Sequence, residues 1–193
     1  MNQSTITNNN SISIDIETLD IKKTSIIVSV GCVVFNKDTP INEFCIEKDF
    51  ILNLKEQSRL GRTVGIDTIL WWLEHNSNNL AIFNTNPNSC FQLQDFIDNF
   101  YNLIKTNDVN ESWAKSPNFD LEILNNLYNQ LHYEFPLDFR GWMDVRTILN
   151  VRKYLNLEDI PFKYNKHSSL GDAKHQAEII IDTYQYLKTK NSL

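Results

Sequence analysis

Two carboxylates, Asp15 and Glu17, stand two residues apart near the start of the chain. Isoleucines at Ile12, Ile14 and Ile16 alternate with them, which predicts a β-strand with its isoleucines in a core and both acids on the other face. Two like charges about 5 Å apart repel by roughly 3 kcal/mol at an effective dielectric constant near 20. A divalent cation with oxygen ligands would neutralise the pair. Taken alone, the pair fits an edge strand with a solvated acidic face at least as well.

A third carboxylate, Asp120, follows a strand-like segment at 110–115 and opens a predicted helix at 121–131. A carboxylate at a helix N-terminus is favoured by the helix dipole and can cap the helix. Capping is therefore a sufficient explanation of Asp120 when this residue is considered by itself.

The third group pairs a histidine with an acid, because His167 precedes Asp172 by five positions and Asp172 begins a predicted helix at 171–187. A lone histidine beside a helix cap is usually an exposed surface residue. An imidazole titrates near neutral pH, however, and can serve as a general base. On a loop one turn ahead of Asp172, His167 would reach over a metal ion held by that acid.

In order, these groups are Asp-x-Glu on a first strand, Asp after a later strand, and His-x-x-x-x-Asp entering the last helix. This pattern resembles the DEDDh exonucleases of the ribonuclease H-like fold, and the resemblance runs from Ile12 to about Tyr186. A DEDDy enzyme would carry tyrosine four residues before the last acid, where Ser168 stands. Five further segments are similar to the phage-encoded 3′-5′ exodeoxyribonucleases and their bacterial exoribonuclease relatives: 15–19, 28–31, 68–72, 113–120 and 144–147. The loop after Trp113 lacks the glycines of many relatives.

The resemblance implies an α/β fold, with a ribonuclease H-like mixed sheet made of an antiparallel three-strand meander plus parallel strands and flanked by helices. It also implies a metal-dependent 3′-5′ exonuclease that hydrolyses single-stranded DNA or RNA 3′ ends to 5′-mononucleotides. By resemblance, Asp15 bridges two divalent cations, Mg²⁺ or Mn²⁺, Glu17 and Asp172 hold the ion that activates water, and Asp120 helps to hold the second ion. His167 would be the general base. The alternative is a non-catalytic nucleic-acid-binding module on the same fold.

Substrate contacts are also expected beside these acids. Thr18 and Leu19 follow the metal acids and, as in the family, would meet the terminal sugar and base. Trp71 and Trp72 are candidates for a stacking face, although adjacent helical residues point about 100° apart, so one of the two is expected to face a ligand. Burial in the core is an equal alternative for each tryptophan. Phe119 is a candidate to pack beside the last base, and Lys115 and Arg146 are candidates for phosphate contacts.

The elements that must position these residues follow from local patterns. We expect a central strand at 26–35, a third strand at 44–46, an irregular segment at 52–64, and a helix capped by Asp67 and running to Leu73. Further helices are expected at 91–104 and 144–155. Cys32 and Cys45 fall in predicted strands, where a buried thiol acts as a small hydrophobe.

The chain of 193 residues fits one domain, which we expect at 12–193 after a disordered polar tail at 1–11. Its net charge of −6 argues against a broad basic nucleic-acid surface. Three cysteines are too few for a disulfide framework, and no apolar run is long enough for a membrane helix. We therefore expect a cytoplasmic protein, in the host cytoplasm if phage-encoded. Similar enzymes are often homodimers, but no feature of this sequence requires one.

Overall fold

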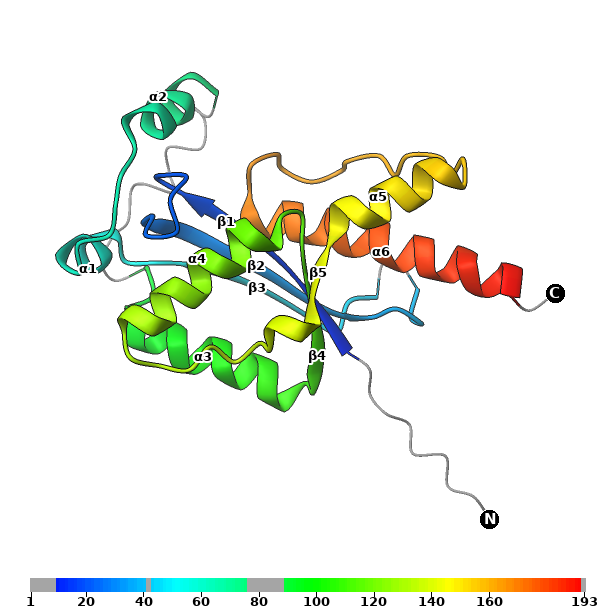
Figure 1. Cartoon of the computed structure of the whole chain (residues 1–193), viewed down its shortest axis with the longest axis horizontal. Helices are drawn as coiled ribbons and strands as arrows, with labels where there is room; N and C mark the ends of the chain where they lie inside the picture. Colours follow the sequence, from blue (N-terminus) through cyan, green and yellow to red (C-terminus); the bar gives the residue numbers. More distant parts are fainter. Residues whose placement is uncertain (1–9, 41–42, 76–88, 192–193) are drawn as a thin grey trace, which may run out of the picture.

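A single mixed sheet organises the protein (Figure 1). The computed structural model describes residues 10–40, 43–75 and 89–191. The strand order across the sheet is β3-β2-β1-β4-β5, with β1 (Asn10–Thr18), β2 (Ile27–Asn36), β3 (Ile46–Ile51), β4 (Val109–Ala114) and β5 (Trp142–Asp144). The first three strands form an antiparallel meander, and β4 and β5 add in parallel. The predicted ribonuclease H-like architecture is thereby confirmed.

Helices cover both faces of this sheet (Figure 1). They are α1 (Leu54–Arg59), α2 (Ile66–His75), α3 (Leu93–Thr106), α4 (Pro117–Gln130), α5 (Val145–Tyr154) and α6 (Ser169–Asn191), with a short 3₁₀ helix η2 (Phe139–Gly141) before β5. In the view of Figure 1, α3 and α4 lie on one side of the strands and α5 and α6 on the other. Within the described ranges, no helix is long and apolar enough to cross a membrane.

Strand β1 is central, so both of its faces are covered. Ile12, Ile14 and Ile16 are 0%, 0% and 5% exposed and belong to the core shared with α3 and α4, as the alternating pattern predicts. The residues between them face the side of the sheet that α6 covers, where Ser13 is fully buried. Asp15 and Glu17 lie at the end of this face and keep partial exposure.

Gly31 of β2 explains how closely α6 approaches the sheet. It pairs with Asp15 across the β1–β2 ladder. A Cβ atom at this position would lie 2.1 Å from the backbone carbon of Ser169 and 2.2 Å from the backbone nitrogen of Leu170. Only glycine leaves room for the first turn of α6 to rest on the sheet beside Asp15.

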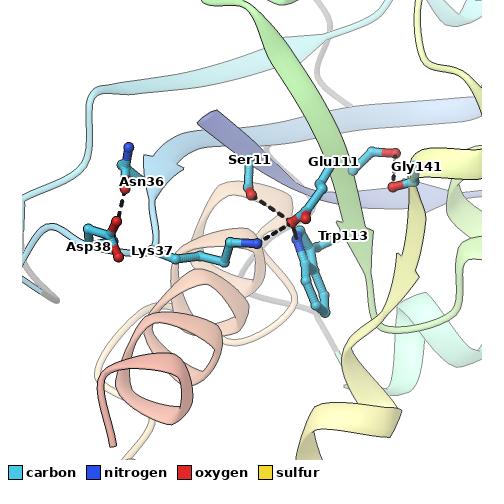
Figure 2. A network of polar contacts seen from close by, with 8 residues as sticks. Ser11, Asn36, Lys37, Asp38, Glu111, Trp113 and Gly141 are labelled. Atoms are coloured by element: carbon cyan, nitrogen blue, oxygen red, sulfur yellow. Dashed lines mark hydrogen bonds and ion pairs between the residues drawn. The ribbon is translucent and has the colours of Figure 1, made fainter. Parts of the chain in front are cut away.

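At the opposite end of β1, a polar network ties three strands together (Figure 2). One carboxylate oxygen of Glu111 accepts hydrogen bonds from the Ser11 hydroxyl at 3.1 Å, the Lys37 ammonium at 2.7 Å and the Trp113 indole N–H at 3.2 Å. These contacts outweigh burial and lower the pKa of Glu111. The network joins the start of β1 and the segment just after β2 to β4, and so fixes the end of the sheet farthest from Asp15 and Glu17.

Several expected boundaries are wrong. Asn10 and Ser11 belong to β1, so the ordered strand starts earlier than residue 12, while 1–9 lie outside the described residues. The segment at 52–64 contains helix α1, which Asn53 caps through its side chain. Strand β3 runs from Ile46 to Ile51 and shares only Ile46 with the expected 44–46 segment, and Cys45 is exposed.

Two further elements differ for local reasons. Helix α2 starts at Ile66, so Asp67 lies in its first turn and is not its cap. Strand β5 is three residues long, too short for a periodic pattern, and the sequence did not indicate it. Cys32 is buried as expected.

Candidate active site

The acids of β1 meet the first turn of α6 at one end of the sheet. Asp15, Glu17 and Asp172 each offer a carboxylate oxygen, and these three oxygens lie within 4.8 Å of one another. All three side chains are partly exposed. Residues separated by more than 150 positions in the chain therefore form one cluster of ligand atoms suited to a metal ion.

Asp120 adjoins this cluster from the first turn of α4. Ser116 is the N-cap residue of that helix, and Asp120 accepts a hydrogen bond from the backbone N–H of Ile16 through Oδ1 at 3.1 Å. The helix-capping explanation for Asp120 is thus incorrect, because its side chain reaches β1 between the two strand acids. Asp120 is 5% exposed, and its charge acts on Asp15.

Burial raises the pKa of each acid, and the charges of neighbouring acids raise it further for Asp15 and Glu17. Burial comes first for Asp15, followed by the charges of Asp120, Glu17 and Asp172, and its pKa lies well above the ordinary value. Burial, followed by the charges of Asp172 and Asp120, raises the pKa of Glu17 to about 8. Burial raises the pKa of Asp120 to about 7, partly opposed by the Ile16 N–H. A divalent cation bound among these four acids would compensate their charge and favour their ionised form.

These acids line an open cleft of about 440 Å³. Its lining residues are Asp15, Ile16, Glu17, Lys115, Ser116, Phe119, Asp120, Arg146, His167 and Asp172. The predicted metal acids, the histidine and three of the expected substrate contacts therefore share one surface. Lys115 and Arg146 are exposed there, and Phe119 is half-buried against the core of α3 and α4.

His167 lies in a turn just before α6 and is exposed at the cleft. Its φ of 58° is uncommon for a non-glycine residue, so surrounding contacts must hold the turn in place. One such contact is Trp71 of α2, whose ring meets the His167 ring edge-on with centroids 5.0 Å apart. Trp71 also stacks on His75 at 5.1 Å.

The two neighbouring tryptophans have different surroundings. Trp71 is 37% exposed, whereas Trp72 is 2% exposed and donates its indole N–H to the Thr18 carbonyl at 3.0 Å. The expectation that Trp72 contacts substrate is therefore wrong, because its ring is packed in the core. Thr18 and Leu19 are 7% and 6% exposed, so their side chains also mainly support the end of β1.

Gln176 was not among the expected site residues. Its side-chain amide donates to Oδ1 of Asp15 at 2.9 Å, and its own oxygen has no hydrogen-bond partner among the described residues. Gln176 stands four positions after Asp172, hence on the same face of α6. That spacing is the sequence feature that could have indicated that Gln176 lies beside the acids.

The chemistry of this donor set fits divalent cations. Carboxylate oxygens are the ligands that Mg²⁺ and Mn²⁺ prefer, and an open, hydrated cleft suits ions that keep part of their water. Asp15 lies among the other acids, and the charges of all three act on it. The residues present can therefore hold such ions.

Comparison with known proteins gives a family match over most of the chain. The family model described as the 3′-5′ exoribonuclease Rv2179c-like domain matches residues 10–183. No curated protein sequence matches significantly.

Among solved structures, the chain is similar to the nuclease domain of 3′hExo, described as a DEDDh family member bound to rAMP. That likeness has 11% identity, covers 92% of each chain and gives a TM-score of 0.66. Cell-death related nuclease 4 (CRN-4) is similar at 13% identity and a TM-score of 0.60, covering 92% of this chain and 64% of that one. A full-length 3′-exonuclease is similar at 11% identity, a TM-score of 0.60, and coverage of 92% and 82%.

Proposed function

Because the chain belongs to the 3′-5′ exoribonuclease Rv2179c-like domain family and is therefore a 3′-5′ exonuclease, we propose that it hydrolyses single-stranded 3′ ends to 5′-mononucleotides by a two-metal mechanism with His167 as general base. The observation that carries this proposal is the convergence of Asp15, Glu17 and Asp172 within 4.8 Å, with Asp120 and His167 lining the same cleft. The family description favours RNA as the substrate.

The acids would hold the cations that the reaction needs. Asp15 would contact both ions, Glu17 and Asp172 one of them, and Asp120 the other. When bound, a pair of Mg²⁺ or Mn²⁺ ions would neutralise the scissile phosphate, favour ionisation of the attacking water and stabilise the leaving oxygen. Gln176 would orient Asp15 through its hydrogen bond.

His167 would take the proton from the attacking water. The water oxygen forms a new bond to the phosphorus of the last phosphodiester, and the bond from that phosphorus to the 3′ oxygen of the preceding nucleotide breaks. The leaving oxygen takes a proton from solvent. The products are a nucleoside 5′-monophosphate and a chain shortened by one nucleotide with a free 3′ hydroxyl.

The rest of the cleft would bind the terminal nucleotide. Lys115 and Arg146 are exposed cations among the acids, and their charges act on Asp172 and Asp120 respectively. Both would contact phosphates of the substrate. Trp71 offers an exposed ring beside His167, and a base stacked there would gain about 1–3 kcal/mol. Phe119 would contact the last base.

The direct test is digestion of matched single-stranded RNA and DNA oligonucleotides labelled at the 3′ end, with Mg²⁺, with Mn²⁺ and with chelator. We expect release of labelled 5′-mononucleotide from the 3′ end, dependent on metal. His167→Ala is expected to slow cleavage by about 10²–10⁴-fold.

A suitable control is His132→Ala, which removes an imidazole outside the cleft and should leave cleavage unchanged. Binding of the oligonucleotides without cleavage under either metal would instead identify the non-catalytic binding module. The homodimer and the cytoplasmic location stay predictions; sedimentation of the purified protein tests the first.

A further inference from the structure

The linker between α5 and α6 lies against one face of α6 just before it reaches His167, which lines the cleft. Residues 162–165 of this linker contact four residues on one face of α6: Gly171, Lys174, His175 and Glu178. Phe162 packs edge-on against the His175 ring, with centroids 4.9 Å apart. The path of the chain into His167 is thus defined by contacts to α6.

Glu178 is the most buried of these contacts. Its side chain is fully buried, and its Oε1 accepts a hydrogen bond from the Tyr164 hydroxyl. The same oxygen forms an ion pair with the Lys163 ammonium at 2.7 Å. Its second oxygen has no hydrogen-bond partner among the described residues. Burying a carboxylate is costly, and an apolar residue would serve better if packing were the sole requirement. Glu178 therefore has a use that depends on its hydrogen bond and charge.

Two lysine ammonium groups also contact the ring of Tyr164. The ammonium groups of Lys163 and Lys174 lie 5.6 and 5.4 Å from its centroid. Lys174 also pairs with Glu47 of β3 at 2.5 Å, which connects the arrangement to the sheet. Cation–π contacts of this kind add to the hydrogen bond in fixing the tyrosine.

The turn that carries His167 is fixed at both ends. Tyr164 anchors its start, and the carbonyl of Ser168 accepts a hydrogen bond from the Asp172 N–H at 2.9 Å at its end. Gly171 allows the linker to pass close to α6, because a Cβ there would lie 2.7 Å from the Asn165 carbonyl oxygen. Between the two anchors, His167 adopts its unfavourable φ of 58°.

We propose that Tyr164 and Glu178 are positioning residues, which hold the His167 turn in its productive place through their buried hydrogen bond. This inference rests on the proposed function, because it requires His167 to act as the general base. Neither residue touches the cleft. They act by limiting how far the imidazole strays from the attacking water, and misplacement of a catalytic group by about 1 Å can cost up to roughly 10²-fold in rate.

The test is a double-mutant cycle with Tyr164→Phe, which removes the hydroxyl and keeps the ring. We expect Tyr164→Phe to lower kcat by about tenfold with KM changed by less than about twofold. In the His167→Ala background, the same change should have no further effect on kcat. Tyr128→Phe is the matched control, because it removes a buried hydroxyl bonded to the Ile97 carbonyl on the other face of the sheet. It should leave kcat unchanged.

A conservative variant and a measurement without turnover complete the design. Glu178→Gln retains an oxygen that can accept from Tyr164, so its kcat should exceed that of Glu178→Leu. Hydrogen exchange of the backbone amides at 165–168 should speed up in Tyr164→Phe and stay unchanged in Tyr128→Phe.

The outcomes separate the two proposals. If His167→Ala cleaves at the wild-type rate, the general-base assignment fails, and the positioning role fails with it. If His167→Ala is slow but Tyr164→Phe has wild-type kcat, or lowers kcat equally in both backgrounds, the positioning role alone is overturned. Unchanged exchange at 165–168 in Tyr164→Phe would also refute it.

Discussion

Asp120 accepts a hydrogen bond from the backbone N–H of Ile16, the residue that separates Asp15 from Glu17 on β1. This contact joins the first turn of α4 to the strand that carries two of the acids. One carboxylate oxygen thereby fixes the distance between two elements that must both reach the cleft. The charge of Asp120 and its hydrogen bond can be removed separately, which leads to the first prediction.

Asp120→Asn keeps an oxygen that can accept from the Ile16 N–H but lacks the charge. We expect at least about a 10²-fold loss of cleavage with the fold intact, because a metal acid is gone. Asp120→Ala also leaves the buried N–H unpaired, which costs about 1–3 kcal/mol. In urea unfolding without metal, Asp120→Ala should therefore have a smaller free energy of unfolding than Asp120→Asn. Equal stability of the two would show that the Ile16 contact contributes nothing.

Metal-free stability should depend on pH through Glu17. Its folded pKa of about 8 lies above the ordinary 4.5, so the folded state binds the proton more tightly than the unfolded chain does. The stability this contributes is full below the ordinary value and is lost as pH rises through about 8. Between about pH 5 and pH 8, the melting temperature of the wild-type protein should fall more than that of Glu17→Gln. A wild-type slope no steeper than that of Glu17→Gln would contradict the raised pKa of Glu17.

Bound cations should reverse that loss. Because ions bind the native cluster and hardly the unfolded chain, a concentration 100 times the dissociation constant adds about 2.7 kcal/mol of stability. Melting curves in Mg²⁺ or Mn²⁺ should therefore shift upward for wild type and much less for Asp15→Asn. The matched control, Asp98→Asn, removes an exposed carboxylate on α3 and should respond as wild type does. A wild-type curve unaffected by either ion would argue against a metal site.

Gly31 and Gly61 offer a paired test of why glycine is needed. At Gly31 a Cβ would strike the backbone of Ser169 at 2.1 Å, so Gly31→Ala must displace α6 and should cost more than about 3 kcal/mol or prevent folding. At Gly61 no atom lies within 4 Å of the added Cβ, and φ is +77°. Gly61→Ala should therefore cost about 1–2 kcal/mol through backbone strain alone. Chemical denaturation measures both, and a milder effect at Gly31 than at Gly61 would be inconsistent with the tight packing of α6.

Substitution of Trp72 should mainly lower stability, whereas substitution of Trp71 should mainly affect activity. Trp72→Ala removes a buried ring and its hydrogen bond to Thr18, with an expected cost of about 3–5 kcal/mol. Trp71→Ala removes a partly exposed ring against His167, and we expect a raised KM with a much smaller loss of stability. Thermal melting and steady-state kinetics on both variants check this. The reverse pattern would mean that α2 presents its other face to the cleft.

The sequence by itself determined the order of the candidate site residues along the chain and much of the sheet. Isoleucines alternating with Asp15 and Glu17 placed the two acids on one face, because strand periodicity is a local property. The position of Asp172 at the start of the last helix followed in the same way. The proximity of these three acids is observed; their roles in the reaction stay proposals.

The tertiary structure decided what depends on packing between distant segments. Trp71 and Trp72 are equivalent as neighbours on a helix, and their different burial depends on how α2 lies against Leu19, Ile26 and Val28. Gly31 is an unremarkable strand glycine until α6 rests on it. In the sequence, Glu178 is indistinguishable from an exposed acid on a helix. Its partner Tyr164 lies on a linker whose sequence has no hydrophobic periodicity. Local patterns specify which way a side chain points along its own element, but the neighbour it meets is fixed when separate elements pack together.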